Sequence, residues 1–364
     1  MYIYFIPVFA QTFGATFLDL GFIGSASALA YALTPILVGF LADRFNRAWL
    51  FVLGVLINAL AAITLTLSGS VRDIVILRLL GGFGFGFFWP TAEVLVTDLA
   101  PSERRVREMG RYSVAWASGF LIGPSIGGLI VERFGYILLF EIAGIVVAAS
   151  IVPAILRVVP RYRGKPTTPS SFSGSISTIR LLLPWYLMSL SYGVVFSVIS
   201  SVFPGYANYA GVGLSLIGVL FTAFGISRVV VFATAERYLR FGEKKALLIA
   251  SGFVVLASLI IAVLPNFAAF LVAFVMIGGS FGVIFPLTIG LISRHFPDQR
   301  LGVAIGSYEA IFGVGFTVGP LMAGVVATVA SISLAFQVTS LFGVLMILFA
   351  FSGRTYSSPA SGKS

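Results

Sequence analysis

The sequence of 364 residues contains no cysteine, a single histidine and few charged residues. Without cysteine the chain can form no disulfide, no thiolate nucleophile and no cysteine-ligated metal site, and His295 alone cannot build a histidine metal cluster. Only 10% of the residues are charged, whereas a soluble protein carries about 25%. These shortages argue against a soluble protein and against an enzyme, and no cofactor or metal is expected.

Long apolar runs are abundant instead. Hydrophobic residues make up 59% of the chain, and the mean hydropathy is +1.05. Continuous apolar runs of about 20 residues suit helices that cross a membrane, because barrel strands alternate polar and apolar residues over about ten. The sequence therefore predicts an all-α membrane protein with twelve spans, at residues 2–18, 22–42, 48–68, 74–97, 110–131, 136–157, 180–203, 213–235, 245–264, 267–293, 302–328 and 332–351.

The placement of basic residues predicts the orientation. The net charge of +10 would suit nucleic-acid binding, but most of the basic residues lie between the spans on one side, and the outer loops keep only Arg72 and Arg133, each beside an acid. This is the positive-inside pattern of a multi-pass protein of the plasma membrane, with the lipid bilayer as partner and no nucleic acid. Both termini, the basic linker 158–179 and the tail 354–364 are expected at the cytoplasmic face.

The two halves of the sequence repeat. Gly123-Pro124-Ser-Ile-Gly127-Gly128 recurs as Gly319-Pro320-Leu-Met-Ala-Gly324, and at the same offset Gly119 matches Gly315. An internal repeat of this kind is typical of transporters built from two bundles. We expect a six-helix bundle at 1–157, the linker, and a second bundle at 180–353.

A charged segment between the second and third spans reads Gly39-Phe-Leu-Ala-Asp43-Arg44-Phe-Asn-Arg47. It resembles the helix 2–3 loop of the major facilitator superfamily, whose signature is glycine, three residues, aspartate, arginine, two residues and arginine. The resemblance implies this superfamily's twelve-helix fold and a latch at the cytoplasmic end, with Asp43 facing the N-terminus of helix 11. The latch residues are Gly39, Asp43, Arg44, Arg47 and Asp98, with an imperfect second copy at Glu236, Arg237 and Arg240. The alternative is an ordinary positively charged loop.

Two further motifs carry the resemblance. Arg78, in the fourth span, resembles an arginine of the family that is linked to proton coupling; the alternative is an arginine whose head reaches the interface. Gly-Pro-x-x-Gly-Gly in the fifth span resembles a motif associated with antiporters; the alternative is packing alone. Its residues and their repeat are Gly119, Gly123, Pro124, Gly127, Gly128, Gly319, Pro320 and Gly324.

Several ionisable residues lie within the apolar runs, and such residues are functional candidates. Glu93 follows Arg78 by fifteen residues, so both lie within about 60° on one helix face. Arg228 and Glu309 lie at similar depths, which suggests an ion pair or a proton-switched pair. For Glu141 and Asp19 we favour solvation at the interface.

The resemblance also implies that helices 1, 4, 7 and 10 line a central cavity. The substrate-binding candidates on these spans are Gln11, Trp89, Tyr186, Ser189 and Tyr192. Aromatic residues in membrane helices are more often packing or interfacial residues, so packing is the alternative for each.

The predicted function is secondary active transport of a small molecule by alternating access, with protons as coupling ion and the chain acting as a monomer. Export of amphipathic compounds or drugs is favoured by the fifth-span motif and the embedded carboxylates. Uptake of a small organic anion or sugar is the alternative that Arg78 and Arg228 favour. A channel or a membrane enzyme is the alternative of another class, and the six-plus-six repeat argues against a channel.

Overall fold

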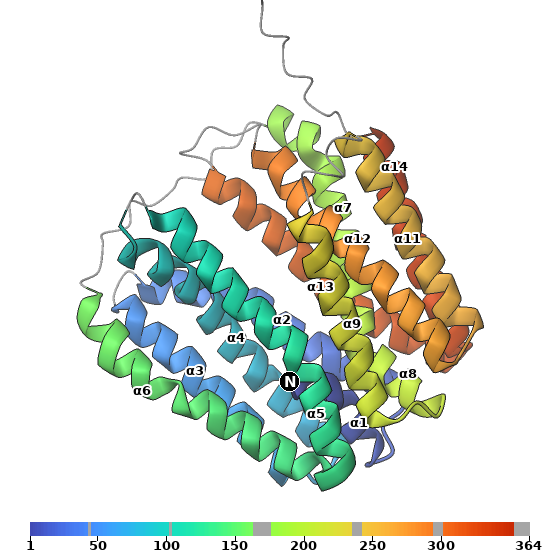
Figure 1. The fold of residues 1–364 in the computed structure, drawn as a ribbon, viewed down its shortest axis with the longest axis horizontal. Coiled ribbons are helices and arrows are strands. Elements are labelled where there is room, and N and C mark those ends of the chain that lie inside the picture. Colours follow the sequence, from blue (N-terminus) through green and yellow to red (C-terminus); the bar gives the residue numbers. More distant parts are fainter. Residues whose placement is uncertain (43–44, 102–103, 163–175, 235–241, 294–300, 353–364) are drawn as a thin grey trace, which may run out of the picture.

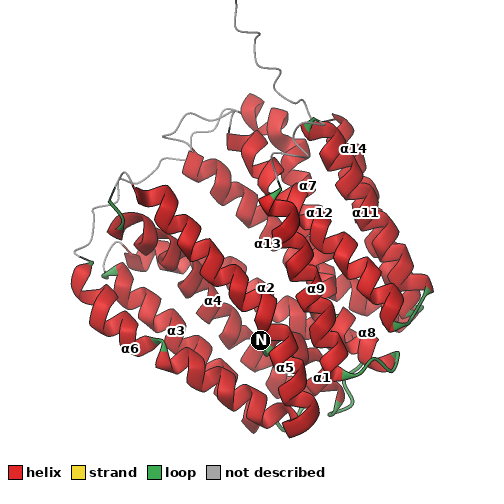
Figure 2. Cartoon of the chain, viewed as in Figure 1, coloured by secondary structure: helices red, strands yellow, loops and turns green. Residues whose placement is uncertain are grey.

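The computed structural model describes residues 1–42, 45–101, 104–162, 176–234, 242–293 and 301–352, and the latch residues Asp43, Arg44, Glu236, Arg237 and Arg240 lie outside them. Within these ranges all regular structure is helical (Figure 2). The long helices are α2 (Phe17–Ala42), α3 (Arg47–Thr64), α4 (Val71–Leu99), α5 (Arg105–Ala149), α7 (Ile176–Ser201), α9 (Leu214–Ala233), α11 (Glu243–Val263), α12 (Phe267–Ser293), α13 (Leu301–Val329) and α14 (Ile332–Ser352). The short elements are η1 (Ile3–Phe5), α1 (Ile6–Gln11), η2 (Leu65–Leu67), α6 (Ile151–Pro153), η4 (Ala154–Val158), η5 (Val159–Arg161) and α8 (Phe203–Tyr209).

Ten helical stretches of the described chain are long and apolar enough to cross a membrane. The stretch from Arg107 to Arg161 is 55 residues long and bends at Gly135, whose φ of 85° and ψ of 174° are accessible only to glycine at little cost. It therefore contains two of the predicted spans, 110–131 and 136–157.

The twelve-helix count is not fully confirmed, because the first predicted span, 2–18, is short in the structure. Its residues form η1 and α1, and α1 ends at Gln11. The chain then turns at Gly14, with φ 79°, and α2 begins at Phe17 instead of near residue 22. The all-α membrane architecture agrees with the prediction.

The helices form two groups that lie side by side, the first half before the linker and the second half after it (Figure 1). The two largest helix crossings between them are α2 on α13 and α5 on α9, and α2 also contacts α7. The short helices α1 and α8 also meet between the halves. We call the end that holds α1 and α8 the closed end, and the end where α3 begins and α4 ends the basic end.

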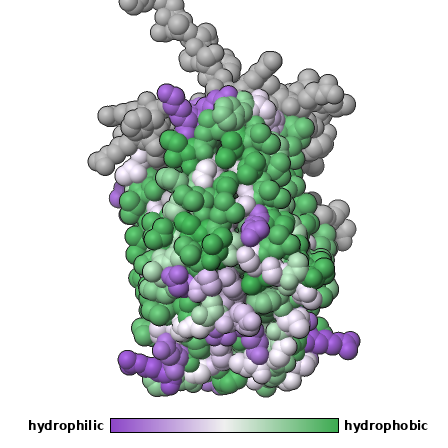
Figure 3. Space-filling model, turned by 90° about the vertical axis from the view of Figure 1, so that its right-hand side faces the viewer, coloured by the Kyte–Doolittle hydropathy of each residue, from purple (hydrophilic) through white to green (hydrophobic). Residues whose placement is uncertain are grey.

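The outer surface has the polarity of a membrane protein. A hydrophobic band lies between hydrophilic residues at the two ends (Figure 3). On α11, for example, Ile249, Phe253, Leu256 and Val263 are all exposed and follow one helix face. An apolar face of this size would be unfavourable in water and suits contact with lipid tails.

Candidate functional site

At the closed end, polar side chains connect the two halves. The carboxylate Oε2 of Glu132, in α5, accepts a hydrogen bond of 2.7 Å from the backbone N–H of Ser215 in the first turn of α9. Gln11 at the end of α1 donates from Nε2 to the Gly205 carbonyl (3.0 Å) and accepts from Asn208 (3.0 Å), both in α8. Gln11, a predicted cavity residue, is therefore placed in this seal between α1 and α8.

The glycine-proline motif of each half lies in one of the two crossings. On α5, a side chain at Gly128 would meet the Leu214 carbonyl of α9 at 2.7 Å, and Gly218 of α9 lies against Pro124. On α13, a side chain at Gly324 would meet the Phe17 carbonyl of α2 at 2.6 Å. Small residues let the helix backbones approach here, so the repeated motif builds equivalent contacts α5–α9 and α2–α13.

The remaining motif residues have different neighbours. Pro320 lies against Gly21 and Gly24 of α2. Gly319 approaches α7, and Gly123 and Gly127 face the first residues of the chain. Gly119 has no atom close to the position of an added Cβ, so the contact between helices does not require glycine there.

Hydrogen bonds between the halves continue from the closed end toward the middle of the protein. Ser125 of α5 and Thr222 of α9 lie 2.7 Å apart, and the Thr222 hydroxyl also donates to the Leu121 carbonyl (2.9 Å). Ser25 of α2 donates to the Thr317 carbonyl of α13 (2.6 Å). Both crossings are thus held by polar contacts as well as by small residues.

Two embedded carboxylates, one from each half, lie near each other about two helical turns from the basic end. Glu93 of α4 is exposed and Glu309 of α13 is half-buried, and their charges act on one another. Both carboxylates also interact electrostatically with the hydroxyl of Tyr31 in α2. Glu93 interacts in the same way with the hydroxyl of Tyr112 in α5. Neither carboxylate forms an ion pair with a described residue. Tyr31 was not predicted from the sequence, because nothing in its local pattern separates it from a packing tyrosine.

Arg228 of α9 does not form the ion pair with Glu309 that similar depth suggested, although both residues belong to the described chain. Its guanidinium instead lies over two aromatic rings, at 5.7 Å from the ring centre of Trp116 in α5 and 5.9 Å from that of Phe285 in α12. Depth along a helix is readable from sequence, but the rotation of the helix about its axis decides which partner is reached.

Arg78 is half-buried in α4, and its charge interacts electrostatically with the hydroxyl of Tyr2 near the start of the chain. It has no ion pair with a described residue. Asp19, predicted near the height of Arg78, accepts hydrogen bonds from the backbone and hydroxyl of Thr16 (2.8 and 2.7 Å) and caps the start of α2.

The other cavity candidates fall into two groups. Trp89 belongs to an edge-packed cluster with Tyr112 (ring centres 6.4 Å apart) and Trp116 (5.8 Å). Tyr186, Ser189 and Tyr192 are buried on α7. Ser189 donates to the Tyr308 carbonyl of α13 (3.1 Å), and Tyr192 packs on Phe281 of α12 at 4.3 Å.

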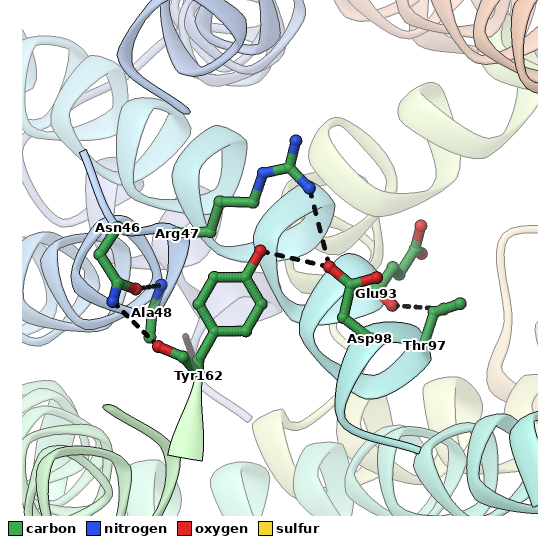
Figure 4. A network of polar contacts seen from close by, with 7 residues as sticks. All are labelled: Asn46, Arg47, Ala48, Glu93, Thr97, Asp98 and Tyr162. Carbon is green, nitrogen blue, oxygen red and sulfur yellow. Dashed lines mark hydrogen bonds and ion pairs between the residues drawn. The ribbon is translucent and has the colours of Figure 1, made fainter. Parts of the chain in front are cut away.

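At the basic end, three segments meet in one network (Figure 4). Arg47, at the start of α3, lies 3.8 Å from the Asp98 carboxylate at the end of α4. The Tyr162 hydroxyl donates to the same carboxylate at 3.2 Å. Asn46 caps α3 by accepting from the Ala48 N–H (2.8 Å) and donates to the Tyr162 carbonyl (3.1 Å). The structure thus places Arg47 and Asp98 together, and their role in a latch stays a prediction.

Tyr162 was missed by sequence reasoning, which assigned it to the linker. It follows η5 and is buried against Ala48 and Leu95. Burial raises the pKa of Tyr162 above its ordinary value, an effect that the nearby Arg47 opposes and Asp98 reinforces. The hydroxyl therefore keeps its proton at neutral pH and remains a donor to Asp98. Of the other latch residues in the described chain, Gly39 lies in the last turns of α2.

This arrangement, with helices in two repeated halves and polar groups embedded between them, is that of a membrane transporter. The chain belongs to the Major Facilitator Superfamily, whose family model matches residues 1–235 and 185–364.

Similar proteins support this assignment over most of the chain. The Quinolone resistance protein NorA of Staphylococcus aureus is 25% identical, with 94% of this chain and 90% of that protein covered. An MFS-type transporter of Methanocaldococcus jannaschii, MJ1560, is 22% identical over 95% of this chain and 92% of its own length.

Solved structures share the fold. A bacterial homologue of the human lysosomal transporter Spinster, in an inward-facing and occupied conformation, superposes with a TM-score of 0.80 at 16% identity, covering 98% of this chain and 94% of that one. The nucleoside transporter NupG, as its D323A mutant, gives a TM-score of 0.76 at 14% identity over 96% and 94%.

Proposed function

We propose that this transporter exports amphipathic compounds in exchange for protons, by alternating access. The two halves, near 1–157 and 180–353, are the units that rock. The similarity to a protein of quinolone resistance over 94% of the chain supports export, and the many basic residues at one end support a cytoplasmic location of that end, of the termini and of the linker. The protein works in the plasma membrane as a monomer.

We assign the structure to the state of the transport cycle in which the basic end is open and the closed end is shut. The contacts between the halves described above run from the closed end, at Glu132 and Ser215, to the middle, at Trp116 and Arg228. The network of Arg47, Asp98 and Tyr162 lies within the first half. In the outward-open state we expect the latch residues, with Asp43 and the segment 236–240, to join the halves at the basic end.

The proximity of Glu93 and Glu309 is the observation that supports proton coupling. Carboxylates within a membrane protein are expensive and mark proton pathways. These two come from opposite halves and act on each other, so rocking of the halves changes the surroundings of both. A proton taken up in one state and released in the other is the coupling step of an exchanger.

Vesicle transport tests the proposal. Liposomes containing the protein, with an acidic lumen, are expected to accumulate a fluorescent aromatic cation as protons leave. Glu309→Gln is expected to reduce this accumulation by roughly tenfold or more, because glutamine carries no exchangeable proton. Glu141→Gln is the matched control, since Glu141 is exposed on α5, and should transport normally. Undiminished proton-driven transport in a variant with both Glu93 and Glu309 neutralised would contradict the assignment.

Uptake of an organic anion or sugar is the second candidate, favoured by Arg228, which has no ion pair with a described residue. The same vesicles separate the two directions. A proton symporter accumulates substrate when the outside is acidic, whereas an exchanger does so when the lumen is acidic. Saturation of the flux with substrate would distinguish either carrier from a channel.

A further inference from the structure

The guanidinium of Arg228 occupies an aromatic cage built by both halves. It faces the ring of Trp116 from the first half and that of Phe285 from the second, at 5.7 and 5.9 Å. When a guanidinium lies over an aromatic ring, its N–H groups point outward in its own plane and remain free to bind an anion. Arg228 forms no ion pair with a described residue, and an embedded arginine is unfavourable without a partner.

Further unpaired donors lie on α5, the helix that supplies the Trp116 wall of the cage. Within the described chain, the indole Nε1 of Trp116 and the hydroxyl of Tyr112 are buried and have no hydrogen-bond partner. The two residues are four apart on α5 and so lie on one helix face. Trp89 packs edge-on against both rings. The cluster therefore offers hydrogen-bond donors and flat apolar surface together.

The charge of Arg228 is not neutralised by an acid of the described chain. No ion pair joins it to Glu309, the embedded acid of the second half. A ligand that reaches Arg228 thus meets an available cation between aromatic rings.

We infer that Arg228 and Trp116 form the recognition site for the carboxylate of an aromatic amphiphile, which makes aromatic carboxylates a substrate class of this transporter. The inference rests on the proposed transport function. The guanidinium fork matches a carboxylate with two parallel hydrogen bonds, while the aromatic body of the ligand packs on Trp116 and Phe285. Because the cage has walls from both halves, the bound ligand contacts the two units that rock.

Binding to the purified full chain tests the inference, with 2-naphthoate as probe and methyl 2-naphthoate as the uncharged counterpart. The carboxylate should bind the wild-type protein roughly tenfold more tightly than the ester. Arg228→Gln should remove this preference and leave ester binding unchanged. Arg228→Lys should give an intermediate result, because lysine keeps the charge but lacks the planar fork. Arg157→Gln, at an exposed arginine of the basic end, is the matched control.

Equal binding of acid and ester by the wild-type protein, or an unchanged preference in Arg228→Gln, would overturn the inference. If Arg228→Gln does not fold, Trp116→Phe keeps an aromatic wall but removes the N–H donor together with one ring of the indole. It should weaken naphthoate binding roughly threefold more than ester binding, because only the carboxylate loses a hydrogen bond, and an equal effect on both probes would overturn the inference. If aromatic cations are transported in exchange for protons but naphthoate binding does not depend on Arg228, the binding site is refuted and the proposed function stands. Arg228-dependent binding without any transport refutes the proposed function alone.

Discussion

The carboxylate of Glu132 accepts a hydrogen bond of 2.7 Å from the backbone N–H of Ser215. This contact joins α5 of the first half to the N-terminal turn of α9 in the second. An acid at a helix N-terminus is favoured by the unpaired N–H groups and by the helix dipole. The bond must break when the closed end opens, so its strength biases the balance between the two states.

Glu132→Ala is therefore expected to open the closed end more often. The chain has no cysteine of its own, so a single cysteine placed at Thr222 reports access to the α5–α9 crossing. Labelling of that cysteine by a membrane-impermeant maleimide from the closed end should become roughly twofold faster or more. Arg133→Gln, at the exposed neighbour, should label at the original rate. An unchanged rate in Glu132→Ala would show that the hydrogen bond does not contribute to closure.

The basic-end network predicts energetic coupling between Asp98 and Arg47. The pair is partly exposed, with side-chain accessibilities of 15% for Arg47 and 18% for Asp98, and the two groups are 3.8 Å apart. A pair of this kind contributes about 0.2–1 kcal/mol. A double-mutant cycle with Asp98→Asn and Arg47→Gln, read by thermal unfolding in detergent, should yield that interaction energy. Strictly additive effects of the two substitutions would mean that the contact is not formed in solution.

Tyr162 predicts a pH dependence in the alkaline range. Burial raises its folded-state pKa above the ordinary value of 10.0, so the folded protein holds this proton more tightly than the unfolded chain does. The corresponding stability is fully present below pH 10.0 and is lost as the pH rises beyond it. Tyr162→Phe should show a smaller loss of stability on alkalinisation than the wild-type protein. Tyr209→Phe, at an exposed tyrosine, should follow the wild-type curve; identical curves for all three proteins would contradict the prediction.

The α2–α13 crossing predicts intolerance of a methyl group at Gly24. A Cβ there would lie 2.6 Å from Ser201 Cβ and 2.8 Å from Pro320 Cβ, too close for either to remain in place. Gly24→Ala should destabilise the protein by about 1–3 kcal/mol, as overpacking does in cores. Gly252→Ala is the matched control in α11, where no atom lies within 4 Å of an added Cβ. It should leave the unfolding temperature unchanged or raise it, and an equal loss in both variants would remove the packing argument.

The long apolar runs determined the helical membrane architecture by themselves. In hydrocarbon every backbone N–H and C=O must be paired within the segment, so a continuous apolar run of this length can form only a helix. The repeated Gly-Pro motif likewise marked positions where backbones meet, because only small residues permit close approach. The segment from Gly39 to Arg47 also indicated the family, through its resemblance to the helix 2–3 loop of the superfamily.

Only the tertiary structure decided which residues face each other. Gln11 lies in the closed end because α1 stops there and meets α8. Tyr162 joins Asp98 across 64 positions of sequence, and Arg228 lies over Trp116 instead of pairing with Glu309. A sequence specifies the face of a helix on which a residue lies. The partner of that residue depends on the rotation, tilt and crossing of neighbouring helices, which the packing of the whole chain fixes.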